Sequence, residues 1–292
     1  MTLTELRYIV AVARERHFGR AAASCHVSQP TLSVAVKRLE DELGVMLFER
    51  NRNDVTPTPA GERIVQQASR VLEEAETLRQ LAKSGRDQLV GPLRLGAIFT
   101  IAPYLLPHLI PALHEIAPKM PLTIEENYTA RLSEHLKQGD LDAIIISLPF
   151  DEPGVVTLPL YDEPFVALLP SSHPLAEQET LSLERLADDT LLMLGPGHCF
   201  RDQIFSVCPR CSRSIQAEGL QGTIEGGSLE TIRHMVASGL GVTVLPCTAA
   251  GADRYAQRLV AVRRFEPPVP TRRVALAWRT SFPRPKAIEA LR

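Results

Sequence analysis

The sequence lacks long apolar runs. No stretch of its 292 residues approaches the about 18 consecutive apolar residues that a membrane-spanning helix requires. The N-terminus also lacks the apolar segment of a secretory signal peptide. These two absences favour a cytoplasmic protein that has no membrane partner.

Cysteine is scarce, and neither sign of charge dominates. The chain holds five cysteines, and cytoplasmic thiols are normally kept reduced, so a structural disulfide framework is not expected. The 32 basic residues nearly balance the 34 acidic ones, so net charge says nothing about a binding partner. Local patterns must therefore indicate fold and function.

Two short helices joined by a tight turn are predicted between residues 18 and 50. The first runs from about Gly19 to Ser24, where consecutive alanines allow another helix to pack closely. The second begins after Ser28, a good N-cap, with Pro30 in its first turn. Spacings of four, three and four predict a buried stripe on it, made of Leu32, Val36, Leu39 and Leu43.

The opposite face of this second helix is polar near its N-terminus. Such side chains hydrogen-bond base edges and phosphates in the major groove of DNA. The candidate DNA-binding residues here are Ser28, Gln29, Pro30, Thr31, Ser33, Lys37 and Arg38. An ordinary helical hairpin with a solvated face is the alternative.

The flanking segments predict a three-helix domain with a wing. Thr2 and Glu5 match a capping box, and a helix with apolar periodicity follows them. Further on, Phe48 and Val55 flank the charged turn ERNRND, as in a short two-stranded wing. The candidates at its tip for contact with a phosphate or a narrow minor groove are Arg50 and Arg52.

One long helix is predicted from Pro59 to about Ser84. Its apolar residues alternate at four and three, a period that favours helix pairing, and they are Ile64, Ala68, Val71, Ala75, Leu78 and Ala82. Paired helices would make the chain at least a dimer and would require a two-fold-symmetric DNA site. The alternative is a single helix that lies on its own domain.

Short apolar runs alternate with helical patterns from Gly91 onward, which indicates α/β architecture with parallel sheets. The expected strands are 93–97, 122–126, 143–147, 165–169, 191–194 and 242–245. Two further helices are expected, one capped by Ser228 and one that starts near Lys286. Proline-rich breaks indicate two lobes between which the chain crosses and returns, and they lie at 148–154 and 264–273.

The expected fold class is therefore α/β, with an N-terminal all-α winged helix-turn-helix and a long linker helix before a two-lobed α/β domain. The remaining length suits one bilobal unit. The expected boundaries are 1–58 for the DNA-binding domain, 59–87 for the linker and 88–292 for the regulatory domain, with lobe I at about 88–163 and 268–292 and lobe II at about 164–267.

The segment LLMLGPGHCFRDQIFSVCPRC carries the most specific chemistry. It places Cys199 at the expected start of a helix, where the helix N-terminus stabilises negative charge. His198 and Arg201 would add positive character if they point inward, so a thiolate would be favoured. Peroxide oxidises a thiolate to a sulfenic acid, which a second thiol can convert to a disulfide. Cys208 is the candidate for that second thiol.

A disulfide between Cys199 and Cys208 cannot span a regular helix. The two cysteines are nine positions apart, which would separate their Cα atoms by roughly 13 Å along a helix, whereas a disulfide needs about 4.4 to 6.8 Å. Oxidation would therefore unwind or re-route this segment. Such a forced rearrangement is a suitable two-state switch.

Three other interpretations of the cysteines stay open. A cysteine is often an inert core residue, which is our expectation for Cys25 and Cys247. Cys208 and Cys211 form a C-x-x-C that could ligate zinc together with His198 and its neighbour. A reactive cysteine with a second thiol would also suit a thiol peroxidase, although the predicted DNA-binding domain argues against turnover.

Residues 1–84 resemble the winged helix-turn-helix and linker helix of the LysR-type transcriptional regulators. The resemblance rests on AAASCHVSQPTLSVAVKRLEDELGVMLFER and the following TPAG. It implies that residues 28–38 are the recognition helix and that the linker helix builds dimers that assemble into tetramers. The remainder resembles the two-lobed effector domain of this family, which is akin to periplasmic binding proteins.

The GHCFRDQ segment and its spacing to Cys208 are similar to the peroxide-sensing members of that family. By this similarity, hydrogen peroxide is the signal, Cys199 reacts with it and Cys208 resolves the product. The residues implied to support the peroxide site are Thr100, Thr129, His198, Arg201 and Asp202. Each of the two threonines could instead be only a helix N-cap. Cys211 departs from the pattern, since it could compete for Cys199 or exchange with Cys208.

The function implied is that of a homodimeric or homotetrameric regulator rather than an enzyme. It would bind double-stranded promoter DNA in both redox states and recruit RNA polymerase, when oxidised, at genes for peroxide defence. No cofactor and no metal are expected. The alternative is a LysR-type regulator whose lobes hold a small metabolite, with Thr100 and Thr129 as its ligands.

Overall fold

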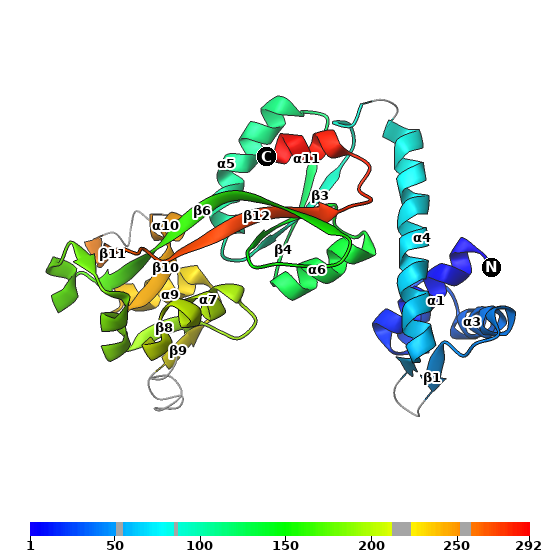
Figure 1. The fold of residues 1–292 in the computed structure, drawn as a ribbon, viewed down its shortest axis with the longest axis horizontal. Helices are drawn as coiled ribbons and strands as arrows, with labels where there is room; N and C mark the ends of the chain where they lie inside the picture. The colour runs from blue at the N-terminus through cyan, green and yellow to red at the C-terminus, as the bar shows by residue number, and fades with distance from the viewer. Residues whose placement is uncertain (51–54, 85–86, 212–222, 252–257) are drawn as a thin grey trace. The chain divides into compact units, whose positions relative to one another are not determined.

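The computed structural model describes residues 1–50, 55–84, 87–211, 223–251 and 258–292. The chain forms two compact units, Met1–Arg86 and Asp87–Arg292 (Figure 1). Within the described ranges, no helix is both long and apolar enough to cross a membrane.

The N-terminal unit is built on three helices that share one core: α1 (Leu3–Glu15), α2 (Phe18–Ser24) and α3 (Gln29–Leu43). The predicted capping box starts α1, because the Glu5 N–H donates to Thr2 Oγ1 at 3.2 Å and the Thr2 N–H donates to Glu5 Oε2 at 2.8 Å. Ala21 and Ala22 of α2 are buried against the neighbouring helices, as small residues allow.

Helix α3 begins as predicted. The Ser28 hydroxyl accepts the Thr31 N–H at 3.3 Å, and Pro30 lies in the first turn. Three of the four predicted stripe residues are fully buried, namely Leu32, Val36 and Leu39. The polar face therefore remains free for another partner.

The prediction for Leu43 was wrong, since this side chain is 37% exposed. The helix ends there, before Gly44 in the left-handed conformation, so the stripe does not continue. Glu40 is buried instead, because its carboxylate accepts the backbone N–H groups of Leu47 and Phe48 at 2.8 and 3.3 Å. Burial of a charged group requires such partners.

The predicted wing is present, since β1 (Phe48–Arg50) pairs antiparallel with β2 (Val55–Pro57). The candidate Arg52 and the side chain of Arg50 lie outside the described part of the chain.

Helix α4 (Pro59–Ser84) matches the predicted long helix. Its N-terminal half contacts α1, and Ala68 is buried there, which agrees with a helix that lies on its own domain. Leu78 in the second half is 70% exposed, so this member of the predicted seam is available for contact with another helix. The side chain of Ala82 is outside the described residues.

Lobe I of the second unit holds the parallel strands β3 (Leu93–Ile98), β4 (Leu122–Asn127) and β5 (Ala143–Ser147), in the order β4-β3-β5. Their side chains form one core with helices α5 (Ala102–Ile116), α6 (Thr129–Gln138) and α11 (Pro285–Leu291). Each strand lies within a residue of its predicted range, because short apolar runs bounded by turns are a strong local signal.

Two long strands join the lobes, as the proline-rich breaks predicted. Strands β6 (Val155–Pro170) and β12 (Thr271–Arg279) run antiparallel side by side (Figure 1). Strand β12 also pairs with β5 of lobe I, while β6 pairs with β10 (Thr243–Pro246) and β11 (Val260–Phe265) of lobe II. The expectation of parallel sheets was wrong here, because the chain that leaves lobe I in β6 returns in the opposite direction in β12.

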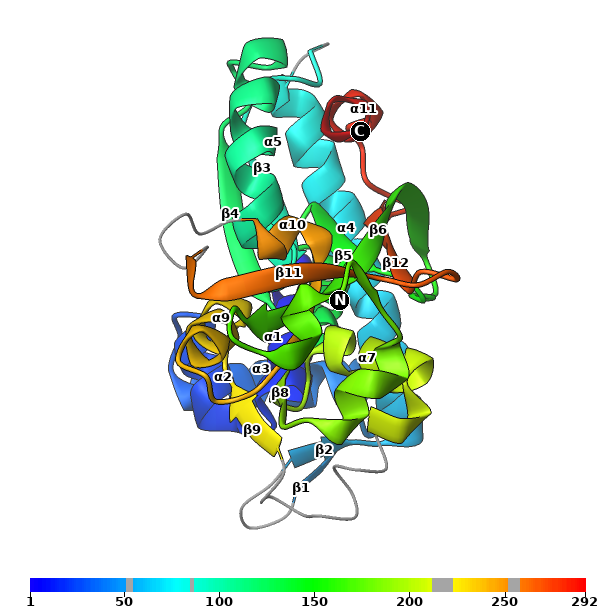
Figure 2. The same ribbon diagram turned by 90° about the vertical axis from the view of Figure 1, so that its left-hand side faces the viewer.

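Lobe II packs the remaining elements around β6. Parallel strands β8 (Leu191–Leu194) and β9 (Thr223–Gly226) carry the helices α7 (Cys199–Val207) and α9 (Leu229–Ala237), both of which contact β8 (Figure 2). Helix α9 starts at its predicted cap, where the Thr231 N–H donates to Ser228 Oγ at 3.1 Å. Smaller elements complete the lobe: η1 (Pro174–Glu177), β7 (Thr180–Leu181), η2 (Leu183–Asp188) and α10 (Cys247–Ala250).

Candidate redox site

Cys199 is the first residue of α7, after the turn that follows β8. This confirms the predicted helix start, with His198 at the N-cap position. Phe200 and Ile204 anchor α7 in the core of lobe II. The Cys199 side chain, by contrast, packs against the core of lobe I, so the thiol lies between the lobes.

A small cavity adjoins Cys199. Its volume of about 10 Å³ admits roughly one water-sized molecule. It lies at the carboxyl ends of β3 and β4, where ligands of parallel sheets collect. Four of the predicted site residues line it, but Arg201 and Asp202 do not, and the full lining is Ile98, Phe99, Thr100, Asn127, Tyr128, Thr129, Gly197, His198 and Cys199.

Thr100 is held by an arginine that the sequence analysis did not single out. Arg272 donates through Nη1 to the Thr100 hydroxyl and through Nη2 to the Thr100 carbonyl, each at 2.8 Å. Neither predicted threonine is a helix N-cap, since Ile101 caps α5 and Tyr128 caps α6. Thr100 therefore lines the cavity in an orientation that Arg272 sets.

Arg272 is completely buried together with its counter-ion. Its Nε donates to the Glu163 carboxylate at 2.7 Å, and the two side chains are 0% and 2% exposed. The Thr248 N–H and hydroxyl donate to the same carboxylate, and the Phe200 ring centroid lies 5.4 Å from the guanidinium carbon. Strand alternation was the available sequence signal, because Arg272 and Val274 share the buried face of β12.

The predicted thiolate of Cys199 is not favoured in this state. Burial is the largest effect, and it raises the pKa of the Cys199 thiol above its ordinary value. The Thr129 hydroxyl and the charge of Arg272 lower that pKa, whereas the charge of Asp202 raises it. The prediction was wrong because burial raises the pKa of the Cys199 thiol by more than the neighbouring groups lower it, which favours the neutral thiol.

Thr129 presents an unsatisfied hydroxyl beside the thiol. Among the residues that the structure describes, its buried Oγ1 has no hydrogen-bond partner of regular geometry, yet it lies close enough to Cys199 to lower the pKa of the thiol. A buried polar atom without a partner is destabilising. An oxygen-containing molecule in the cavity would satisfy it.

His198 supplies no positive charge to the site. Burial lowers the pKa of His198, so the imidazole is neutral at pH 7. Its ring packs edge-on against Tyr128, with centroids 4.8 Å apart, and lies 5.9 Å from the ring of Phe99. The expectation of positive character was wrong because burial disfavours the imidazolium.

Arg201 braces the loop that precedes α7. Its guanidinium donates to the Leu194 carbonyl at 2.9 Å and pairs with Glu225 on β9. Asp202 is exposed, and its charge acts against the thiolate of Cys199. Arg201 therefore fixes the loop before α7, while the charge of Asp202 disfavours the thiolate.

Hydrogen bonds from Gln203 and Tyr104 tie the lobes together near the site, and the sequence analysis missed them. Gln203 on α7 donates through Nε2 to Ser147 Oγ of lobe I at 2.7 Å. The Tyr104 hydroxyl on α5 donates to Glu230 Oε1 on α9 at 2.9 Å. Partners so far apart in the chain leave no periodic signal.

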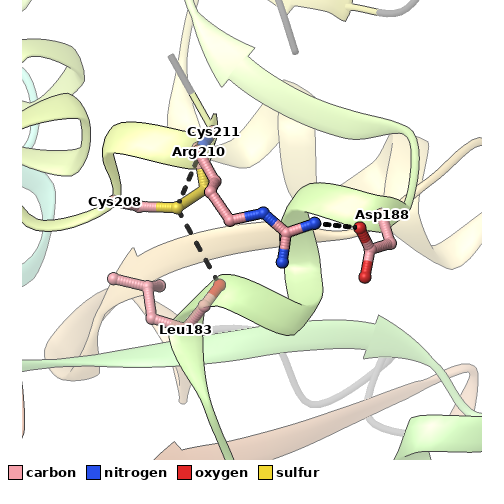
Figure 3. The surroundings of a disulfide bond; sticks show 5 residues. All are labelled: Leu183, Asp188, Cys208, Arg210 and Cys211. Atoms are coloured by element: carbon pink, nitrogen blue, oxygen red, sulfur yellow. Dashed lines mark hydrogen bonds and ion pairs between the residues drawn. A yellow bond between two sulfur atoms is a disulfide. The ribbon is translucent and has the colours of Figure 1, made fainter. Parts of the chain in front are cut away.

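A disulfide joins Cys208 to Cys211, whose Cα atoms are 5.3 Å apart (Figure 3). Cys199 is a free thiol. Both bonded cysteines are buried in the core of lobe II, with 0% and 1% exposure. This pairing corrects the expectation that the cysteines form no structural disulfide. It arises because the backbone after α7 brings the two cysteines together locally.

The other four cysteines are either half-buried free thiols or partners in a disulfide. Cys25 and Cys247 are half-buried free thiols at the edges of their cores, rather than fully buried core residues. Cys208 and Cys211 offer no free thiolate in this state. The described ranges contain no group of three or more His, Cys, Asp or Glu residues placed to hold a metal ion.

The candidate DNA-reading residues form one face at the start of α3. Ser33 is half-buried, and the exposed members are Ser28, Gln29, Pro30, Thr31, Lys37 and Arg38. Val34 on this helix is also 68% exposed, and the sequence analysis omitted it. An apolar side chain there would suit contact with a thymine methyl group.

Comparison with known proteins places both units in one family. The family model "Bacterial regulatory helix-turn-helix protein, lysR family" matches residues 3–62, and the model "LysR substrate binding domain" matches residues 86–292. The chain is 42% identical over 284 residues to the "DNA-binding transcriptional dual regulator OxyR" of Escherichia coli strain K12, which covers 97% of this chain and 91% of that protein.

Solved structures of OxyR proteins are similar to this chain over nearly its whole length. A full-length aspartate mutant of OxyR from Pseudomonas aeruginosa is 58% identical and superimposes with a TM-score of 0.79, covering 100% of this chain and 93% of that chain. An H2O2-bound serine mutant of Corynebacterium glutamicum OxyR is 36% identical with a TM-score of 0.65, covering 99% and 90% of the two chains.

Proposed function

This chain belongs to the LysR family of bacterial regulators, and we propose that it is a DNA-binding transcriptional regulator that senses hydrogen peroxide through a thiol-disulfide switch. The genes it controls serve oxidative-stress defence. The observation that carries the proposal is the water-sized cavity that brings Cys199, Thr129 and Thr100 together. The OxyR relatives, named as hydrogen peroxide-inducible activators, support it.

The first step takes place in the cavity. Peroxide binds with one oxygen at the Thr129 hydroxyl, whose buried Oγ1 otherwise lacks a partner. The Cys199 sulfur attacks a peroxide oxygen, the O–O bond breaks, and the second oxygen leaves as water with the thiol proton. The product is a sulfenic acid. Thr129 and Arg272 assist because both stabilise the thiolate against the cost of burial.

The second step forms the switch disulfide. The Cys208 thiol attacks the Cys199 sulfur, the S–O bond breaks, and the hydroxyl group leaves as water. Because α7 separates the two cysteines, this bond requires α7 to unwind. Unwinding removes the anchors Phe200 and Ile204 and the Gln203 contact to lobe I. Cys208 can act only when its bond to Cys211 is reduced.

The chemistry of one sulfur thereby changes how the lobes are joined. We propose that the protein works as a homodimer or homotetramer, in which the exposed half of α4 supplies a contact between copies. The face of α3 binds promoter DNA in both redox states, and the oxidised form recruits RNA polymerase. The protein acts as a cytoplasmic regulator rather than an enzyme, and it uses no cofactor in this scheme.

The metabolite alternative is less well supported at the predicted position. The cavity at Thr100 and Thr129 measures about 10 Å³, which is too small for a metabolite of several heavy atoms without rearrangement. A regulator with Cys199 and Cys208 both replaced by Ser that still changed its DNA footprint on addition of a metabolite would revive this alternative.

The proposal is tested by thiol pairing and by DNA footprints. The fully reduced chain treated with one equivalent of peroxide should form a disulfide between Cys199 and Cys208, and Cys208→Ser should instead accumulate the sulfenic acid. Cys199→Ser should bind DNA normally and lose the peroxide-dependent change in footprint. Loss of DNA binding in Cys199→Ser, or an unchanged peroxide response, would contradict the proposal.

A further inference from the structure

We propose that Cys211 is an internal exchange thiol that ends the oxidised state by taking Cys208 away from Cys199. This inference rests on the proposed function, because it starts from the disulfide between Cys199 and Cys208. It assigns a role to the C-x-x-C pair that the peroxide reaction itself does not use. The sensor would then switch off without an external reductant.

Helix α7 is intact when Cys208 is bonded to Cys211. With Cys208 bonded to Cys211, α7 is helical from Cys199 to Val207, and the Cys208 N–H donates to the Ile204 carbonyl at 2.9 Å. The disulfide between Cys199 and Cys208 is incompatible with the same helix. The two pairings exclude each other chemically because they share Cys208, and they correspond to different shapes.

Local contacts keep Cys211 beside Cys208. The Cys211 N–H donates to Cys208 Sγ at 3.2 Å, and the same sulfur lies 4.0 Å from the Leu183 carbonyl oxygen (Figure 3). Between the two cysteines, Arg210 pairs with Asp188 of η2 at 2.8 Å. The Arg210 ion pair thereby ties the segment between the two cysteines to η2, which is not part of α7.

The exchange balances without any added reactant. The Cys211 thiolate attacks the Cys208 sulfur of the switch disulfide, the bond between Cys208 and Cys199 breaks, and Cys199 leaves as a thiolate. The proton that Cys211 gave up is taken by Cys199, whose burial raises its pKa in the refolded state. One disulfide is lost and one is formed, so the oxidation state of the protein is unchanged.

Packing of α7 favours the exchange in the direction that releases Cys199. Release of Cys199 lets α7 refold, so that Phe200 and Ile204 return to the core of lobe II and Gln203 regains Ser147. The new disulfide is almost completely buried, which shields it from reductants in solution. The product has the shape expected of the reduced sensor but lacks a resolving thiol, so it cannot switch again until that disulfide is reduced.

A time course of thiol pairing in the full-length protein tests the proposal. Reduced and desalted protein receives one equivalent of peroxide, and samples are quenched with acid, alkylated and digested with trypsin. Cleavage after Arg201 and Arg210 places the three cysteines on separate peptides, 186–201, 202–210 and 211–213. Each pairing therefore has its own mass.

In the natural protein, the bond between Cys199 and Cys208 should appear first and then disappear as the bond between Cys208 and Cys211 accumulates. In Cys211→Ser the first bond should form at the same rate and then persist until dithiothreitol is added. Cys25→Ser, which removes a cysteine of the other unit, is the matched control and should follow the natural protein.

Three other outcomes would each refute either the exchange or the proposed function. If the switch disulfide persists equally in the natural protein and in Cys211→Ser, the exchange is refuted while the proposed function stands. If Cys199→Ser forms the bond between Cys208 and Cys211 as fast as the natural protein, that bond comes from direct oxidation, and the exchange is again refuted. If the bond between Cys199 and Cys208 forms in neither protein, the proposed function itself fails.

A DNA footprint followed over the same time course provides the functional readout. After a single addition of peroxide, the oxidised footprint should revert in the natural protein without reductant and should not revert in Cys211→Ser. Equal persistence in both proteins would overturn the inference.

Discussion

Replacement of Arg272 by methionine would leave the Glu163 carboxylate buried without its counter-ion. Both side chains are at most 2% exposed, so solvent cannot replace the lost pairing. Removal of one partner from a buried ion pair costs about 3–5 kcal/mol. Thr100 would also lose both donors that hold it at the cavity.

A double variant separates the charge from the packing. Because Glu163→Gln removes the stranded carboxylate, Arg272→Met combined with Glu163→Gln should be more stable than Arg272→Met alone. The neighbouring Arg273 is the matched control, since it pairs with Asp162 at 2.6 Å on the exposed surface. Arg273→Met should change stability little, because exposed ion pairs contribute little.

The single tryptophan of the chain makes the assay specific. Trp278 lies on β12, the strand that carries Arg272, so its fluorescence follows the unfolding of the regulatory unit in urea. Peroxide consumption by the reduced variants, measured as a function of pH, reports on Cys199. Because the charge of Arg272 lowers the pKa of the Cys199 thiol, Arg272→Met should shift the rate profile towards higher pH.

Three results would each refute part of this reasoning. A loss of less than about 1 kcal/mol in Arg272→Met would show that the pair is not desolvated as the structure has it. Equal stability of the single and double variants would show that the stranded carboxylate is not the cause. An unchanged pH profile of peroxide consumption would show that Arg272 does not influence the reactivity of Cys199.

Four further predictions follow from the site. Thr129→Val should slow the reaction with peroxide several-fold while leaving urea stability unchanged or slightly raised, because the lost hydroxyl has no partner of regular geometry within the described ranges. Stopped-flow and urea titration check this. Asp202→Asn should modestly speed the reaction at neutral pH, since the charge of Asp202 raises the pKa of Cys199. Burial raises the pKa of Cys199 above its ordinary value of 9.0. The neutral thiol therefore stabilises the folded state below pH 9.0, and this stabilisation is lost as the pH rises through the pKa of the folded state. The free energy of unfolding should accordingly fall less at alkaline pH in Cys199→Ser than in the natural protein, as urea titration at several pH values would show. Lys37→Ala should weaken DNA binding similarly for all sequences and reduce the salt dependence by about one ion, as measured by titration at several salt concentrations; a loss restricted to one base position would argue that Lys37 reads a base instead.

Elements defined by neighbouring residues could be predicted from the sequence. The caps at Thr2, Ser28 and Ser228, the wing and the start of α7 at Cys199 all appear where expected. Each depends on hydrogen bonds or periodic burial within a few residues, so the sequence contains the whole signal. The candidate thiol belongs to this class because a helix start places it, whereas the two threonines of the site were implied only by the resemblance to peroxide-sensing regulators.

Long-range partners could not be predicted. Arg272 and Thr100 are 172 positions apart, and Glu163 lies 109 positions from Arg272. Strand alternation could have placed Arg272 on the buried face, but no local pattern names its partners. The prediction that Leu43 is buried was wrong for a related reason. The end of α3 and the buried carboxylate of Glu40 decide which residues that helix buries.

The sequence by itself determined where the capped helices and the parallel strands of lobe I begin, and which helix start carries the candidate reactive cysteine. The tertiary structure alone decided the protonation of that cysteine and of His198, since burial raises the pKa of the Cys199 thiol and lowers that of the imidazole. It also decided that Cys208 pairs with Cys211 in this state. The physical reason is that desolvation and the meeting of distant groups depend on how the lobes pack, whereas helix caps and strand periodicity depend only on neighbours along the chain.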